Sequence, residues 1–162
     1  MQLYLAEQGL ALSSIENPKE PLSDEGRIGL QKLSSFLARS RFSISKVLHS
    51  KELCAKQTAI ILSQGLGAGR LVQECPVVIE REDRVKHLFE FVHNVSDNVF
   101  NEGTLIVGHA SYLSRFLGSL ICAEERLPVV RFEPGIFVAL EYNKITKKWL
   151  IRWVVQPSLL GI

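Results

Sequence analysis

The chain has 162 residues, a length that fits one domain and that can bury enough surface to fold without disulfides or a structural metal. Hydrophobic residues make up 46% of it and charged residues 22%, which excludes a disordered chain. The 19 Lys and Arg residues against 17 Asp and Glu leave a formal charge of +2, too small to indicate binding to nucleic acid or to an anionic membrane. We therefore expect a single domain over residues 1–162.

The cysteines and the N-terminal residues bear on the compartment. Cys54, Cys75 and Cys122 are an odd number with no CxxC pair, so they predict neither a disulfide framework nor a zinc site, and no cofactor is expected. A signal peptide begins with a positively charged region, but the first fifteen residues contain no Lys or Arg. The most apolar stretch, residues 110–122, contains Arg115 and is too short to span a bilayer. These features predict a cytoplasmic protein without membrane association.

Strand and helix patterns alternate through the first half of the chain. Residues 2–5 read as a strand, residues 13–20 as a loop and residues 46–49 as a short buried strand. Two helices are predicted between and after these strands, the first beginning near Ser23. Their expected apolar positions are Leu30, Leu33, Phe36 and Leu37 in the first helix, and Cys54, Thr58, Ile61 and Leu62 in the second. Glycines at positions 65, 67 and 69 are expected to end the second helix.

The second half continues the alternation. Residues 71–75 read as a possible strand, residues 85–99 as an amphipathic helix, and residues 104–107 as a central parallel strand. Two strands over residues 136–142 and 149–155 are predicted at the C-terminus. A helix with apolar positions Leu113, Phe116, Leu117, Leu120 and Ile121 should precede them. The whole predicts an α/β fold, a three-layer α/β/α sandwich with a mostly parallel sheet.

Ligands in such sheets bind outside the carboxyl ends of the strands. Three strand-to-helix turns are therefore candidates for a site, at residues 7–9, 50–52 and 108–110.

Those turns resemble the histidine phosphatase superfamily, which has the phosphoglycerate-mutase-like fold, and most closely its small SixA-like phosphohistidine phosphatases. The first strand and its turn ending in Gly9 are similar to the Arg-His-Gly turn of the family. Residues 21–26, Pro-Leu-Ser-Asp-Glu-Gly, are similar to Pro-Leu-Thr-x-x-Gly, and residues 50–59 to Ser-x-x-x-Arg-Ala-x-Gln-Thr-Ala. Residues 107–109 match Val-Gly-His. The four motifs occur in the family's order over nearly the whole chain.

The resemblance implies phosphoryl transfer to a histidine, followed by hydrolysis of the phosphohistidine. In the family two arginines and a second histidine surround the phosphate oxygens and stabilise their charge. Among the matching positions, Gln8 stands at the nucleophile, Glu7 at the first arginine and Cys54 at the second, and only His109 is retained. The other positions that the resemblance assigns to the phosphate pocket are Gly9, Ser50 and Gly108.

The replacements predict loss of the family's chemistry. The amide nitrogen of Gln8 is conjugated and cannot form a stable phosphoryl intermediate. Glu7 in place of arginine puts an anion where a phosphate dianion would sit. Two like charges 4 Å apart repel by roughly 4 kcal/mol at an effective dielectric of about 20.

Three functions follow from this pattern as hypotheses. The first is a SixA-like phosphohistidine phosphatase relative that is inactive and acts as a binding or regulatory module, with a phosphohistidine-bearing signalling protein as its partner. The alternative is a weakly active phosphohistidine phosphatase or phosphomonoesterase that uses His109 or Cys54. The third is an interaction protein with a closed pocket.

The individual side chains also have expected structural roles. We expect the imidazole of His109 to hydrogen-bond Gln8 or Glu7, and Cys54 to fill the space of an arginine stem. Ser50 is expected to cap the helix that follows it. His87 and His93 are six residues apart on a predicted helix, which is not a spacing for metal ligands.

Overall fold

The computed structural model describes residues 1–40, 42–67, 72–75 and 103–161. Its strands are β1 (Gln2–Glu7), β2 (Lys46–His49), β3 (Val72–Glu74), β4 (Thr104–Gly108), β5 (Phe137–Asn143) and β6 (Lys148–Val155). Its helices are α1 (Asp24–Leu37), α2 (Leu53–Gly65), α5 (Ala110–Cys122) and a final 3₁₀ turn, η2 (Pro157–Leu160). The predicted helix over residues 85–99, with His87 and His93, lies outside the described residues, and so does Gly69.

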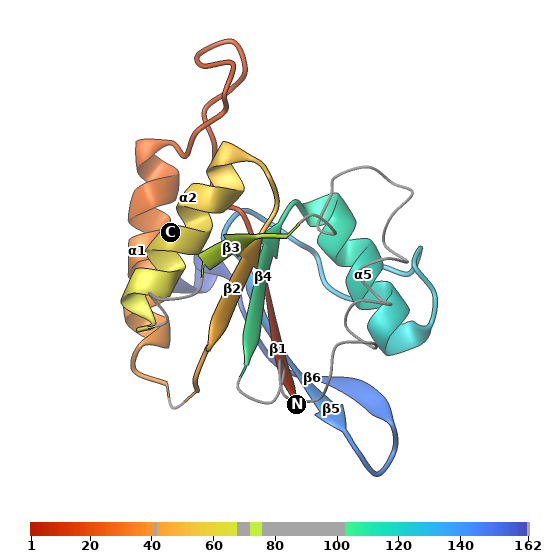
Figure 1. Cartoon of the computed structure of the whole chain (residues 1–162). Coiled ribbons are helices and arrows are strands. Elements are labelled where there is room, and N and C mark those ends of the chain that lie inside the picture. The colour runs from red at the N-terminus through yellow and green to blue at the C-terminus, as the bar shows by residue number, and fades with distance from the viewer. Residues whose placement is uncertain (41, 68–71, 76–102, 162) are drawn as a thin grey trace.

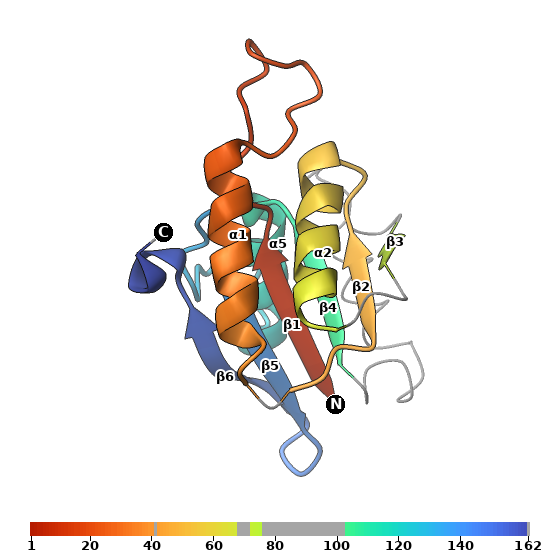
Figure 2. The same ribbon diagram turned by 90° about the vertical axis from the view of Figure 1, so that its left-hand side faces the viewer.

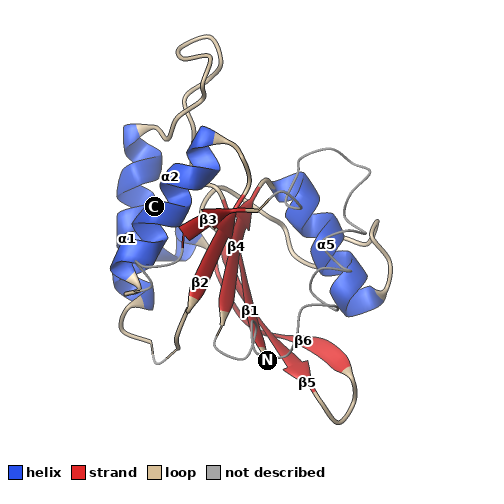
Figure 3. Cartoon of the chain, in the orientation of Figure 1, coloured by secondary structure: helices blue, strands red, loops and turns tan. Residues whose placement is uncertain are grey.

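The six strands form one sheet in the order β3-β2-β4-β1-β5-β6. The first four run parallel, whereas β5 and β6 are antiparallel additions next to β1. Helices α1 and α2 lie side by side on one face and α5 covers the other, as Figures 1 and 2 show. The α/β class, the three layers and the mostly parallel sheet are therefore confirmed, and Figure 3 displays the alternation of helix and strand along the chain.

The sheet separates two hydrophobic cores, because successive side chains of a strand point to opposite faces. In β1, Leu3 and Leu5 pack in the core under α5, while Tyr4 and Ala6 belong to the core under α1 and α2. Every residue of β4 is buried. A continuous apolar run is what a central parallel strand covered on both faces requires, and this strand was predicted on that pattern.

Helix α1 begins where the sequence predicts. The side chain of Ser23 accepts a hydrogen bond from the backbone N–H of Gly26 at 3.0 Å, which satisfies one free donor of the first turn. Gly26 is needed for packing, because a Cβ atom there would lie 2.2 Å from the carbonyl oxygen of Leu10. Leu30, Leu33 and Leu37 are buried as expected, whereas Phe36 is 44% exposed.

Helix α2 corrects one expectation. Its N-cap residue is Glu52, with no side-chain hydrogen bond to the helix, so the prediction that Ser50 caps it is wrong. Ser50 is instead buried at the end of β2, where its backbone N–H donates to the carbonyl of Val107 at 3.1 Å. The hydroxyl of Ser50 has no hydrogen-bond partner among the described residues.

The C-terminal hairpin is confirmed. Strand β5 begins and ends one residue later than predicted, and β6 begins one residue earlier. The side chain of Asn143 accepts hydrogen bonds from the backbone N–H groups of Ile145 and Thr146, at 2.9 and 3.0 Å, and so builds the turn. The turn η2 was not predicted. None of the helices described here has the length and the apolar character to cross a bilayer.

Candidate functional site: a cleft at the carboxyl ends of the strands

The three candidate turns meet at one edge of the sheet. Strand β4 lies between β1 and β2, and its last residue, Gly108, pairs with Glu7 of β1. His49 of β2 pairs with Val107 of β4. Because the helices after β1 and β2 cover one face and the helix after β4 covers the other, the chain separates at this edge, where doubly wound sheets bind ligands.

A cleft of about 570 Å³ opens at this edge. It contains three of the residues assigned to the site from the sequence, which are Gln8, Cys54 and His109. Glu7 and Ser50 are buried at the strand ends and Gly9 is buried beside α1, and none of these three lines the cleft. An open cleft disagrees with the hypothesis of a closed pocket.

His109 forms the rim of the cleft. It is exposed and is the N-cap residue of α5, where its Nδ1 accepts a hydrogen bond from the backbone N–H of Ser111 at 3.3 Å. The hydroxyl of Ser111 lies 3.1 Å from the same nitrogen. The expected bond to Gln8 or Glu7 is absent, because Oε1 of Gln8 and Oε2 of Glu7 have no partner among the described residues and Nδ1 of His109 is used in capping its own helix. In the neutral ring the proton then sits on Nε2.

Cys54 is a buried thiol. It is 2% exposed, and its Sγ donates to the carbonyl oxygen of Gly9 at 3.2 Å. Burial, chiefly, raises the pKa of Cys54 to about 11, although the hydroxyl of Thr58 works in the other direction. The thiolate is the nucleophilic form of cysteine, so at neutral pH this side chain is an unreactive thiol.

The first two backbone N–H groups of the turn after β1 are not available to an anion. The backbone N–H of Gln8 donates to the carbonyl of Gly108 at 3.0 Å, and that of Gly9 donates to Oγ1 of Thr58 at the same distance. In a phosphate-binding loop such N–H groups would point at the ligand. Here both are already used within the protein.

Glu7 gives this end of the sheet an unusual carboxyl group. It is 7% exposed, and its Oε2 has no hydrogen-bond partner among the residues described. Burial, and secondly the nearby charge of Glu133, raise the pKa of Glu7 from 4.5 to about 7. Near neutral pH the group is thus a mixture of carboxylic acid and carboxylate, and no ion pair with a described residue favours the charged form.

Five further residues belong to this region, and of these only Glu52 lay in a turn that the sequence singled out. Lys19, Glu20, Glu52 and Ser111 line the cleft, and Glu133 acts on Glu7. Among the described residues, the cleft therefore has two glutamates and one lysine at its wall. Lys51 and Lys56, which are close to Cys54 in the chain, are exposed and do not line the cleft. In the part of the chain that is described, no three His, Cys, Asp or Glu side chains are grouped as metal ligands would be.

Comparison with solved structures identifies the fold. The protein histidine phosphatase SixA, solved with tungstate, matches 99% of this chain and 99% of its own with a TM-score of 0.83 and 18% identity. An α-ribazole phosphatase from Shigella flexneri matches 97% of both chains with a TM-score of 0.78 and 18% identity. A phosphoglycerate mutase from Bacillus anthracis covers 99% of this chain and 95% of its own, with a TM-score of 0.71 and 11% identity.

The chain therefore has the histidine-phosphatase fold over nearly its full length, and it is structurally similar to SixA phosphohistidine phosphatases. No protein-family model matches the chain, and no curated protein sequence matches it.

Inorganic phosphate is expected to bind this cleft too weakly to stabilise the fold. Its wall carries two glutamates, and the backbone N–H groups of Gln8 and Gly9 are occupied. A ligand at about 100 times its Kd would add roughly 2.7 kcal/mol to the free energy of unfolding. We expect no rise in melting temperature up to 10 mM phosphate, measured against chloride at equal ionic strength. A saturable rise would show that Lys19 and His109 form a working anion site.

Proposed function

We propose that this protein is a SixA-like relative of the histidine phosphatases that does not hydrolyse phosphohistidine and acts as a binding or regulatory module. The observation that carries the proposal is the content of the cleft. Gln8 and Cys54 line it at the positions where the family has its nucleophile and an arginine, and the unpaired carboxyl of Glu7 lies at the end of β1.

Neither remaining candidate nucleophile has a suitable environment. The Nδ1 lone pair of His109 accepts from Ser111, and its Nε2 carries the proton of the neutral ring. The thiol of Cys54 has a pKa of about 11 and donates to a backbone carbonyl. These two observations weigh against the alternative of a weakly active phosphatase or phosphomonoesterase that uses either residue.

The proposed partner is a signalling protein of the kind that carries phosphohistidine. Because no arginine is among the described residues of the cleft wall and the backbone N–H groups of Gln8 and Gly9 are already used, the partner's protein surface would supply the affinity rather than its phosphoryl group. Binding should then be nearly equal for the phosphorylated and the unphosphorylated partner. Titration of both forms by calorimetry tests this, and an affinity that needs the phosphoryl group would contradict it.

The purified protein is expected to release no phosphate above the buffer rate from a phosphohistidine protein or from an aryl phosphate. The physical reason is the loss of the nucleophile and of both cationic groups that would stabilise the transition state. A malachite-green or chromogenic assay measures the release. His109→Ala and Cys54→Ser are the matched variants. Turnover that one of them removes would replace the proposal by an enzyme using that residue.

A further inference from the structure

Two neighbouring depressions of the surface meet at Phe36, near the end of α1. One has a volume of about 340 Å³ and lies between the end of α1, Phe42 and residues Arg152 and Trp153 of β6. The other has a volume of about 390 Å³ and runs along α1 to Leu160 of η2. Figure 2 shows β6 and the C-terminal turn on the same side of α1. We call the two depressions together the α1–β6 groove.

The floor of the groove continues the hydrophobic core. The rings of Trp153 and Phe137 are stacked with their centroids 5.7 Å apart. The ring of Phe42 lies 5.1 Å from that of Tyr4 and 5.4 Å from that of Trp153. Phe137 and Tyr4 are buried, whereas Phe42 and Trp153 are only half-buried. The aromatic part of the core therefore reaches solvent at this groove.

Helix α1 adds two apolar side chains that its own packing leaves in water. Ile28 is 54% exposed and Phe36 is 44% exposed. Both line the second depression, and Phe36 also lines the first, beside the aromatic floor. A single exposed apolar side chain is normal on a protein surface, but these two extend the floor into one apolar surface, which is typical of an interaction site.

Among the described residues, the charged side chains that line the groove are all cations. They are Lys32, Arg39 and Arg152, with no Asp or Glu beside them in the described lining. Arg152 pairs with Glu141 at 3.2 Å, and Nζ of Lys32 donates to the carbonyl oxygen of Gly161 at 3.3 Å. Arg39 is in no ion pair with a described residue. The protein therefore neutralises the positive charge of the groove only in part.

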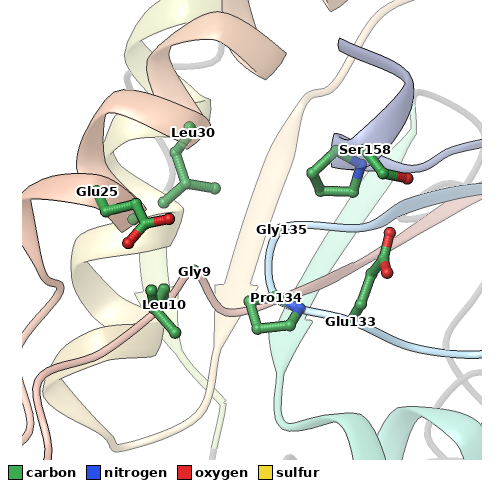
Figure 4. A pocket seen from close by; sticks show the side chains of 11 residues that line it. Gly9, Leu10, Glu25, Leu30, Glu133, Pro134, Gly135 and Ser158 are labelled. Carbon is green, nitrogen blue, oxygen red and sulfur yellow. The ribbon is translucent and has the colours of Figure 1, made fainter. Parts of the chain in front are cut away.

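The beginning of α1 has the opposite charge. Asp24 and Glu25 stand in its first turn. Figure 4 shows Glu25 and Glu133 at the border of a separate cavity on this part of the molecule. An acidic chain that lies along α1 would thus be repelled at the first turn and attracted from Lys32 onward. This distribution of charge directs an acidic partner to the groove.

A second copy of the chain and a lipid surface fit the groove less well. Across a twofold axis the groove would meet itself, so that its cations would face the same cations of the other copy. Apolar side chains that enter a lipid surface protrude from the protein, whereas here they line two depressions. Depressions with an aromatic floor and arginines at their border accept the protruding side chains of a protein segment.

We propose that the α1–β6 groove binds an acidic segment of a partner protein. The segment inserts one bulky apolar side chain into each depression, and its carboxylates pair with Lys32, Arg39 and Arg152. The partner is therefore defined by its chemistry, as aspartates and glutamates around two aromatic or branched aliphatic residues. In the described part of the chain the groove shares no residue with the cleft, and the proposal does not depend on the proposed function.

The probe is an array of short acetylated and amidated peptides made of aspartate and glutamate, with two positions varied among Leu, Ile, Phe and Trp. The peptide that binds most strongly is titrated into the full chain and followed by NMR. Saturable shifts are expected for the amides of residues 28–40 and 152–155, with a Kd on the order of 100 µM at low salt. Because charge contributes to binding, the Kd should rise at least about threefold when salt is raised to physiological strength.

Two altered peptides separate the apolar contribution from the charge. One has serine at both apolar positions, and the other has asparagine and glutamine in place of every aspartate and glutamate. Each is expected to bind at least about tenfold more weakly than the parent peptide, because each loses one of the two features that the groove recognises. An unchanged Kd for either altered peptide would overturn the proposal.

Variants of exposed side chains locate the site without disturbing the core. Phe36→Ser and Arg39→Glu are each expected to weaken the peptide about tenfold. Ile145→Ser and Lys144→Glu are the matched controls, because both residues are exposed in the turn between β5 and β6, and they should leave the Kd unchanged.

Four results would overturn the proposal. Two are the absence of saturable shifts at these amides with any peptide of the array, and unchanged binding by both Phe36→Ser and Arg39→Glu. The third is stronger binding of the same face to vesicles of phosphatidylcholine and phosphatidylserine in equal parts, which would assign it to a membrane. The fourth is a dimer in sedimentation that Phe36→Ser removes, which would assign it to a second copy of the chain.

Discussion

Introducing the groups that the resemblance assigns to three positions, by Glu7→Arg, Gln8→His and Cys54→Arg together, is expected to give a folded protein that binds phosphate and slowly hydrolyses an aryl phosphate. The protein already has the fold of the resembling family, a cleft at the carboxyl ends of its strands, and His109, which the resemblance assigns to the family's chemistry. Gln8 and Cys54 both line the cleft, so longer side chains there can extend into about 570 Å³ of space. At position 7 a guanidinium would pair with Glu133, which now repels the native carboxylate.

Position 54 is the risk in this triple variant. Cys54 is 2% exposed, so an arginine stem there overpacks the core by roughly 1–3 kcal/mol unless its head reaches the cleft. Phosphate at about 100 times its Kd should stabilise the variant by roughly 2.7 kcal/mol, a rise of about 5–10 °C in melting temperature for a domain of this size.

Phosphate-dependent melting and phosphate release are the two measurements for the triple variant. Gln8→His alone is the control, and it should gain neither property, because it supplies the nucleophile without the cations. A well-folded triple variant that neither binds nor hydrolyses would mean that the geometry of the cleft, and not three side chains, separates this protein from the family.

Glu7→Gln is expected to stabilise the protein at pH 8 and to leave its stability nearly unchanged at pH 4.5. The pKa of Glu7 in the folded protein is about 7, above its ordinary 4.5, so the folded state holds this proton more tightly than the unfolded state. The favourable contribution is then full below about pH 4.5 and is lost as the pH rises through about 7.

The size of that effect follows from the shift. A rise of this extent corresponds to an upper bound of about 3 kcal/mol, and solvent near the cleft reduces it to about 1–2 kcal/mol. Urea unfolding of both proteins at the two pH values measures the difference. Glu141→Gln, an exposed glutamate paired with Arg152, should change stability by less than about 1 kcal/mol at either pH. A gain for Glu7→Gln that is equal at both pH values would contradict the assignment.

The periodicity of the sequence carries most of the fold. The apolar run of β4, the capping serine of α1 and the stripe of α5 each have a local cause, so each was placed correctly. The order of the strands has no local signal, and for that reason Glu133 was missed. It precedes β5, whose antiparallel pairing with β1 brings that loop beside Glu7.

The sequence predicted which residues form the candidate site better than it predicted the hydrogen bonds they make. The sequence predicted that Gln8, Cys54 and His109 lie in one site, because three parallel strands end there, and all three line the cleft. It could not show that the imidazole of His109 turns back to its own helix, or that α2 begins without help from Ser50. Such choices depend on the positions of neighbouring backbone groups within a few tenths of an ångström.

The most direct test of the account is a search for a phosphorylated form of the protein itself. The chemistry of the resembling family requires transfer of the phosphoryl group to a nucleophilic histidine, and the resemblance assigns Gln8 to that position. A stoichiometric mixture with a phosphohistidine protein would be followed by ³¹P NMR and intact-protein mass spectrometry. The account predicts that the phosphohistidine signal decays at its rate in buffer and that the protein gains no phosphoryl group. Faster decay together with a phosphorylated chain would contradict it.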